Sequence, residues 1–208
     1  ATNQGDLEDD GHVREAIEAV TETAADAEKL IDSLADEVEK GIVQIETAGT
    51  KIIIRIREKG SFPSGGAHFR ADFLPAIAKL RLLLVNIEGT IVVAGHTDNI
   101  PIKTAKFRSN WELSASRAVS VVHELLDTQA LEPERFVVEG HGGAHPIAPN
   151  DIAENRALNR RVEMIIEQGT DEEPAAEEPI GALPRAGSKL GSLAEFDDGQ
   201  TVTDPVGA

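Results

Sequence analysis

The chain has 208 residues without a cysteine, so neither disulfides nor thiolate sites can form, and none of its apolar runs reaches the roughly 18 residues of a membrane span. Its formal charge of -17 lies at the two ends: residues 1–40 carry 13 acidic and 3 basic side chains, and residues 169–208 carry 9 and 2. The middle part is balanced, with 15 of each sign. Such acidic flanks repel a phosphate backbone, so we exclude nucleic acid as a partner.

The N-terminal part predicts a long helix. Residues 1–11 are polar and rich in Gly and Asp, and we expect them to be disordered. Residues 12–41 then carry apolar side chains at helical spacing, without proline or glycine until Gly41, which predicts one amphipathic helix that ends there. Its apolar stripe is narrow and rich in alanine. We expect it to pack on the domain or on a second copy of the chain, and the alternative is a regulatory element.

The middle, residues 42–168, alternates short apolar runs with helical patterns. The expected strands are 42–45, 52–56, 90–94, 136–139 and 161–166, and the expected helices are 70–85, 109–128 and 151–159. Pro75 requires the first of these helices either to start near Leu74 or to be kinked. The pattern predicts an α/β (α+β) sandwich, in which helices pack on one mixed sheet. Residues 169–208 are expected to be an acidic disordered tail.

A polar cluster follows the third predicted strand. Gly95, His96, Thr97 and Asp98 come directly after the apolar run "TIVVA". In an open α/β sheet the carboxyl ends of strands are where ligand-binding groups project. Asp98 is therefore a better binding candidate than an aspartate elsewhere on the surface.

An arginine lies on the apolar side of the next predicted helix. At 100° per residue, Arg117 falls between Leu113 and Val121 on the face toward the core. A buried guanidinium needs an anionic partner, and Asp98 is the obvious one within the chain. The two side chains together would equally suit a zwitterionic ligand, whose carboxylate binds the arginine and whose ammonium binds the aspartate. The pattern alone leaves a plain salt bridge and a ligand site equally open.

Three motifs in this order resemble the OmpA-like peptidoglycan-binding family. They are "GHTD" at 95–98, "NxxLSxxRA" at 110–118 and "NRRVE" at 159–163, and the resemblance covers roughly residues 50–168. It implies that the chain binds peptidoglycan without catalysis and without a cofactor or a metal. It also implies that Asp98 and Arg117 hold the diaminopimelate of the wall stem peptide. Thr97, Asn110, Leu113 and Arg161 occupy positions that would line or support the same pocket.

Finer features look like the flagellar stator B subunits of the MotB/PomB group. These are "GHTDNIPI", "FRSNWELSASRA" and "GSFPSGGAHF". That resemblance implies a motility protein of the periplasm, a fragment of a protein anchored in the inner membrane. Its implied partners are peptidoglycan, a second copy in a homodimer, a stator A subunit reached through a membrane segment, and flagellar ring proteins. Because the chain begins with Ala1 and shows no secretion signal, we expect a piece of something longer.

Two other interpretations are weaker. His96, Asp98, His141 and His145 all flank predicted strand ends, and such a set can bind zinc in a hydrolase. They lie in loops, however, and no HExxH motif accompanies them. Within the family, an outer-membrane lipoprotein or a porin tail that tethers the outer membrane to the wall is the alternative to a stator subunit.

Overall fold

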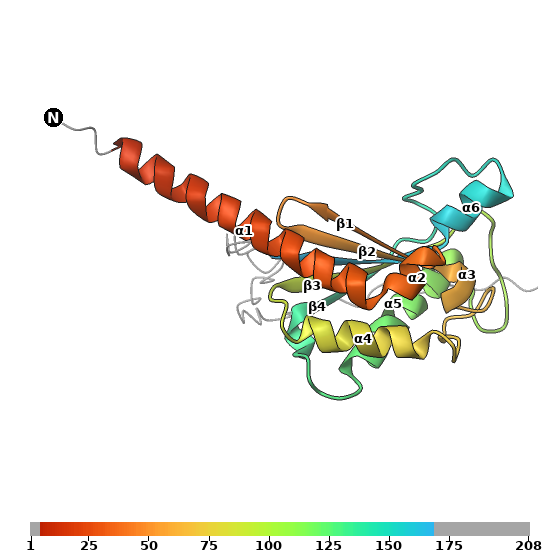
Figure 1. Ribbon diagram of the computed structural model, residues 1–208. Coiled ribbons are helices and arrows are strands. Elements are labelled where there is room, and N and C mark those ends of the chain that lie inside the picture. The colour runs from red at the N-terminus through yellow and green to blue at the C-terminus, as the bar shows by residue number, and fades with distance from the viewer. Residues whose placement is uncertain (1–4, 169–208) are drawn as a thin grey trace, which may run out of the picture. The chain divides into compact units, whose positions relative to one another are not determined.

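A five-stranded mixed sheet forms the centre of residues 5–168, the part of the chain that the computed structural model describes (Figure 1). The strands lie in the order β1-β2-β5-β3-β4, with β3 and β4 parallel and the other neighbours antiparallel. Their bounds are β1 Val43–Ala48, β2 Lys51–Arg57, β3 Thr90–His96, β4 Phe136–Gly140 and β5 Arg161–Glu167. The predicted mixed sheet is confirmed.

Three helices cover one face of this sheet. The helices are α1 Gly5–Ser33, α2 Ala35–Glu39, α3 Glu58–Ser61, α4 Leu74–Leu84, α5 Asn110–Leu126 and α6 Ala153–Asn159, with a short 3-10 helix at Pro133–Arg135. Figure 1 shows α1, α4 and α5 side by side on the same side of the strands. Pro75 lies in the first turn of α4, where its missing N–H breaks no helical hydrogen bond. The helix therefore starts at Leu74, as the first of the two alternatives predicted.

Alternation along the strands builds the core. Ile54 of β2, Met164 of β5 and Val93 of β3 are adjacent in the register, and all three are fully buried beneath the helices. Their neighbours along each strand, such as Arg55 and Glu163, point to the opposite face. The two faces of β2 and β5 therefore differ in polarity, which fixes their pairing register.

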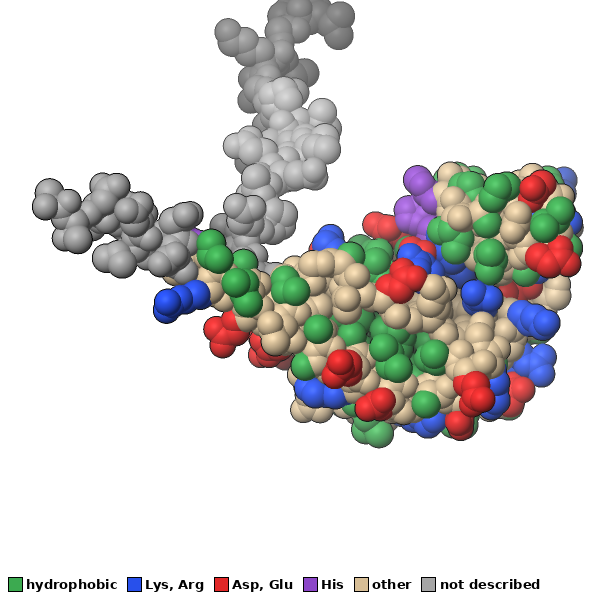
Figure 2. Space-filling view, turned by 45° about the horizontal axis from the view of Figure 1, so that its top comes forward, with side chains coloured by type: hydrophobic (Ala, Val, Ile, Leu, Met, Phe, Trp, Pro, Cys, Tyr) green, Lys and Arg blue, Asp and Glu red, His purple; other side chains and the backbone are tan. Residues whose placement is uncertain are grey.

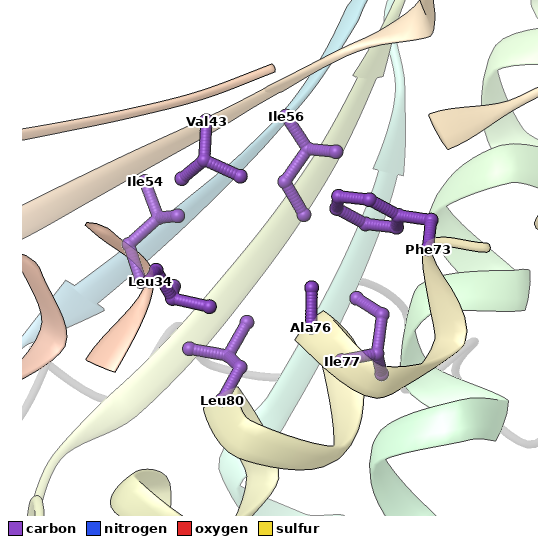
Figure 3. Close-up of a pocket in the computed structure, with 8 residues that line it drawn as sticks. All are labelled: Leu34, Val43, Ile54, Ile56, Phe73, Ala76, Ile77 and Leu80. Atoms are coloured by element: carbon purple, nitrogen blue, oxygen red, sulfur yellow. The ribbon is translucent and has the colours of Figure 1, made fainter. Parts of the chain in front are cut away.

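The N-terminal helix differs from the expected one in its bounds. It begins at Gly5, not near residue 12, and it is interrupted at Leu34 before α2 completes the segment. Leu30 and Leu34 are 0% and 1% exposed. Figure 3 shows Leu34 pointing at side chains of β1, β2 and α4, with no space for a water molecule between them. The last turns of α1 are thus part of the core.

The structure does not test what the sequence predicts for the two ends of the chain. Residues 1–4 and 169–208 lie outside the described residues, so the disordered tail remains a prediction. Within residues 5–168 no helix has both the length and the apolar character needed to cross a membrane.

Candidate functional site

The polar cluster after β3 is held by the first turn of α5. Ser109 caps this helix, because its Oγ accepts a hydrogen bond from Glu112 N. Asn110 then donates from Nδ2 to the carbonyls of Asp98 (3.3 Å) and Ile100 (2.9 Å). Its Oδ1 accepts from Ile102 N at 3.2 Å. Asn110 therefore fixes the loop that carries Asp98, and its own amide group is used up in doing so.

A chain of four alternating charges runs through the site. Asp98 Oδ2 lies 2.6 Å from Arg160 Nη1, Arg160 Nε lies 3.2 Å from Glu58 Oε1, and Glu58 Oε2 lies 2.7 Å from Arg117 Nη2. Asp98 and Arg117 are therefore not a direct pair. Glu58 and Arg160, which were not predicted as site residues, stand between them. Each acid in the chain touches a guanidinium, which makes the network neutral and compact.

The four charges differ in their access to solvent. The side chain of Arg160 is 31% exposed, those of Glu58 and Asp98 are 11% and 8% exposed, and that of Arg117 is 1% exposed. This chain of charges thus runs from the partly exposed guanidinium of Arg160 to the buried guanidinium of Arg117. Any charged ligand reaches Asp98 and Arg160 first.

Arg117 is enclosed by the segment that follows β2. Its Nε donates to Gly66 O at 2.8 Å, and its guanidinium carbon lies 5.4 Å from the centre of the Phe62 ring. The Nη2–Glu58 contact is short enough for an ion pair but is not aligned as a hydrogen bond, and Nη1 has no partner within residues 5–168. Burial lowers the pKa of this guanidinium, and the charge of Glu58 opposes that shift. A buried donor without a partner is a place where a ligand oxygen would be stabilised.

The other predicted site residues fall into two groups. Thr97 and Leu113 are buried beside Asp98 and at the start of α5, where Thr97 Oγ1 donates to Asp98 O. Arg161 is not brought to this site. It points to the opposite face of β5, where its Nε donates to Glu163 Oε1 at 2.8 Å and its Nη2 to His145 O at 3.3 Å. The neighbouring Arg160 takes the place that was expected for Arg161.

The predicted histidines come together on that opposite face. His96, His141 and His145 form a cluster, whereas Asp98 turns toward Arg160. As they are placed in residues 5–168, no three His, Asp or Glu side chains converge on a point where they could hold a metal ion.

The part of the chain that carries this site is similar to known proteins. Residues 62–160 match the model of the OmpA family. Motility protein B of Bacillus subtilis is 39% identical over 152 residues, which are 69% of this chain and 58% of that protein. The chain thus spans little more than half the length of this relative.

Two solved structures are similar over most of their length. The cell wall anchor of the T6SS from Pseudomonas aeruginosa is 36% identical with a TM-score of 0.63, and the match covers 67% of this chain and 97% of that one. A putative MotB-like protein from Desulfovibrio vulgaris is 27% identical with a TM-score of 0.67, and the match covers 76% and 98%. Both matches cover more of the chain than residues 62–160 do.

Proposed function

The chain belongs to the OmpA family, and from this premise we propose that it binds peptidoglycan and anchors a membrane machine to the cell wall without catalysing a reaction. The observation that carries the proposal is the charge chain from Asp98 to Arg117 at the carboxyl end of β3. The names of its relatives, a motility protein and a cell wall anchor, support the anchoring role. On the same ground we place the chain in the periplasm.

The ligand we propose is the diaminopimelate side chain of the stem peptide. Its end carries an ammonium and a carboxylate. Asp98 binds the ammonium, and the exposed guanidinium of Arg160 receives the carboxylate. Arg117 lies on the interior side of the site, where its Nη1 can donate a hydrogen bond to the ligand carboxylate. It also pairs with Glu58, whose carboxylate would otherwise compete with the ligand for Arg160. Asn110 and Thr97 keep the Asp98 loop in place.

A pair of soluble stem peptides tests this assignment. The first contains diaminopimelate, and the second contains lysine, which keeps the ammonium but lacks the carboxylate. We expect the lysine peptide to bind at least about tenfold more weakly by isothermal titration, because one charge-assisted hydrogen-bond pair is lost. Equal affinities would contradict the zwitterion assignment while leaving peptidoglycan binding itself open.

We further propose that the chain works as a homodimer beside a stator A subunit, with flagellar ring proteins as further partners. The support is an apolar stripe on α1: Val13, Ile17 and Val20 are 51%, 62% and 46% exposed. They lie on the helix face that Ala27 and Leu34 bury further down. A second copy of α1 would cover them.

Sedimentation equilibrium tests the homodimer. The wild-type chain should associate at high concentration, and Ile17→Glu should remain monomeric, because it places a charge in the apolar stripe. Glu22→Ala, on the polar side of the same helix, is the matched control and should associate like the wild type. A wild-type chain that stays monomeric throughout would refute the homodimer.

A further inference from the structure

Three histidines stack on the face of the sheet opposite the helices. The rings of His96 and His141 lie 5.0 Å apart and nearly parallel, and His145 meets His141 edge-on at 4.8 Å. His96, at the end of β3, is 4% exposed. Neither of its ring nitrogens has a hydrogen-bond partner within residues 5–168. A buried polar ring without partners is costly, so its presence calls for a physical reason.

The charged groups around His96 leave little compensation for an imidazolium at that position. On β5, Glu163 Oε1 accepts from both Arg161 Nε (2.8 Å) and Arg55 Nε of β2 (2.9 Å), while its Oε2 stays 3.9 Å from His96 Nε2. On β4, Glu139 Oε2 contacts His141 Nε2 at 2.8 Å. On β1, Glu46 is paired with Arg55. Among residues 5–168, Glu163 and Glu46 are thus engaged with arginines, and Glu139 with His141.

The pKa of His96 reflects this environment. Burial, followed by the charge of Arg161, lowers it from 6.5 to about 4, although Glu163 pulls the other way. His141 and His145 lower it further. Since the folded pKa lies below the unfolded value, neutral His96 contributes stability above pH 6.5, and this contribution is lost as the pH falls from 6.5 toward 4.

The stack is connected directly to the loop that carries Asp98. His141 N donates to Gly95 O at 2.9 Å, and Thr97 N donates to Gly142 O at 2.8 Å. Gly143 packs so closely on Asp98 that an added Cβ would lie 2.7 Å from its carbonyl oxygen. The loop after β4 thus fixes the position of Thr97 and Asp98 together with Asn110.

We propose that His96, His141 and His145 are positioning residues for the Asp98 loop, and that they hold it in place only while the buried imidazole of His96 is neutral. Protonation of His96 places an uncompensated charge inside the fold beside Arg161, so the loop after β4 separates from β3 and Asp98 loses its support. Wall binding then weakens in acid. The binding part of this inference rests on the proposed function, whereas the loop movement does not.

The single tryptophan of the chain reports on this loop. Trp111 lies against Gly142, where an added Cβ would be 3.4 Å from the indole Cδ2. We expect its fluorescence to change reversibly between pH 6.5 and 4, while far-ultraviolet circular dichroism stays constant. Over the same range, co-sedimentation with purified peptidoglycan should weaken about tenfold, as it would if about a tenth of the molecules kept the competent loop.

Two variants and one control separate titration from packing. His96→Gln removes the buried imidazole, whereas His141→Phe keeps an aromatic ring packed beside His96. His96→Gln should flatten the acid response of fluorescence and of binding, and His141→Phe should retain it. His123→Gln, on the exposed side of α5, should keep the wild-type profile.

Several results would overturn the proposal. They are a Trp111 emission that stays constant from pH 6.5 to 4, or an acid response that is identical in wild type and His96→Gln. Should the wild-type chain bind peptidoglycan at no pH, the proposed function fails, while the fluorescence profile still decides whether the stack holds the loop.

Discussion

Replacing Arg117 by alanine should destabilise the fold by about 3–5 kcal/mol, because it leaves the buried carboxylate of Glu58 with only the longer of its two ion pairs. The substitution also removes the contacts to Gly66 O and to the Phe62 ring. Arg117→Lys should recover part of the loss. An ammonium can pair with Glu58 but cannot reproduce the guanidinium fork.

Thermal unfolding followed by circular dichroism measures this loss. Arg70→Ala is the matched control, because Arg70 is half exposed and its one ion pair within residues 5–168 is with the exposed Asp72, so its loss should cost less than about 1 kcal/mol. An Arg117→Ala protein as stable as the Arg70→Ala protein would show that the charge chain does not stabilise the fold.

Gly95→Ala should be at least as damaging, by about 3 kcal/mol or more, for a steric reason. A Cβ on Gly95 would lie 2.0 Å from the backbone oxygen of Ser114, so α5 could not approach β3. Helix α5 would have to shift as a unit, with Val121 and Leu125 leaving the core. The obstacle is backbone, which cannot rotate out of the way as a side chain could.

Gly49→Ala is the control for this substitution. Gly49 has a φ of +61° in the β1–β2 turn, but no atom of the described part of the chain lies within 4 Å of an added Cβ. Its replacement should cost only the strain of a left-handed residue, about 1–2 kcal/mol. Chemical denaturation of both variants gives the comparison. Equal losses would mean that the close approach of β3 and α5 is not required.

Much of the fold could be read from periodicity. The five strands and the helices α4, α5 and α6 were predicted because their apolar residues alternate or recur at helical spacing, whereas α3 and the 3-10 helix at Pro133–Arg135 were not predicted. The interruption at Leu34 was not predicted, since neither proline nor glycine marks it. The early start of α1 at Gly5 was missed because the first residues are polar.

The site was predicted only in part, although the sequence pattern contains a signal for the two residues that were missed, Glu58 and Arg160. Ile52, Ile54 and Ile56 face the core, and Glu58 continues their alternation just beyond β2. An acid at such a position needs a buried cation. Val162 of β5 faces the core, and the same alternation would have placed Arg160, two positions earlier, on that side.

The sequence alone could not predict which acid pairs with which arginine. Glu58 and Arg117 are 59 positions apart, and Asp98 and Arg160 are 62 apart, so only the arrangement of β2, β3, β5 and α5 shows which acid meets which arginine. The histidine stack has the same origin. Its members come from the ends of two parallel strands, which the sheet order places side by side.

Co-sedimentation of folded Arg117→Ala protein with purified peptidoglycan tests the central claim most directly. The measurement is made well below the unfolding temperature of the variant, with circular dichroism confirming the fold and Arg70→Ala as control. The charge chain predicts that wild type and Arg70→Ala sediment with the wall and that Arg117→Ala stays in solution. A folded Arg117→Ala protein that sediments like the wild type would contradict the assignment of this site as the wall-binding site.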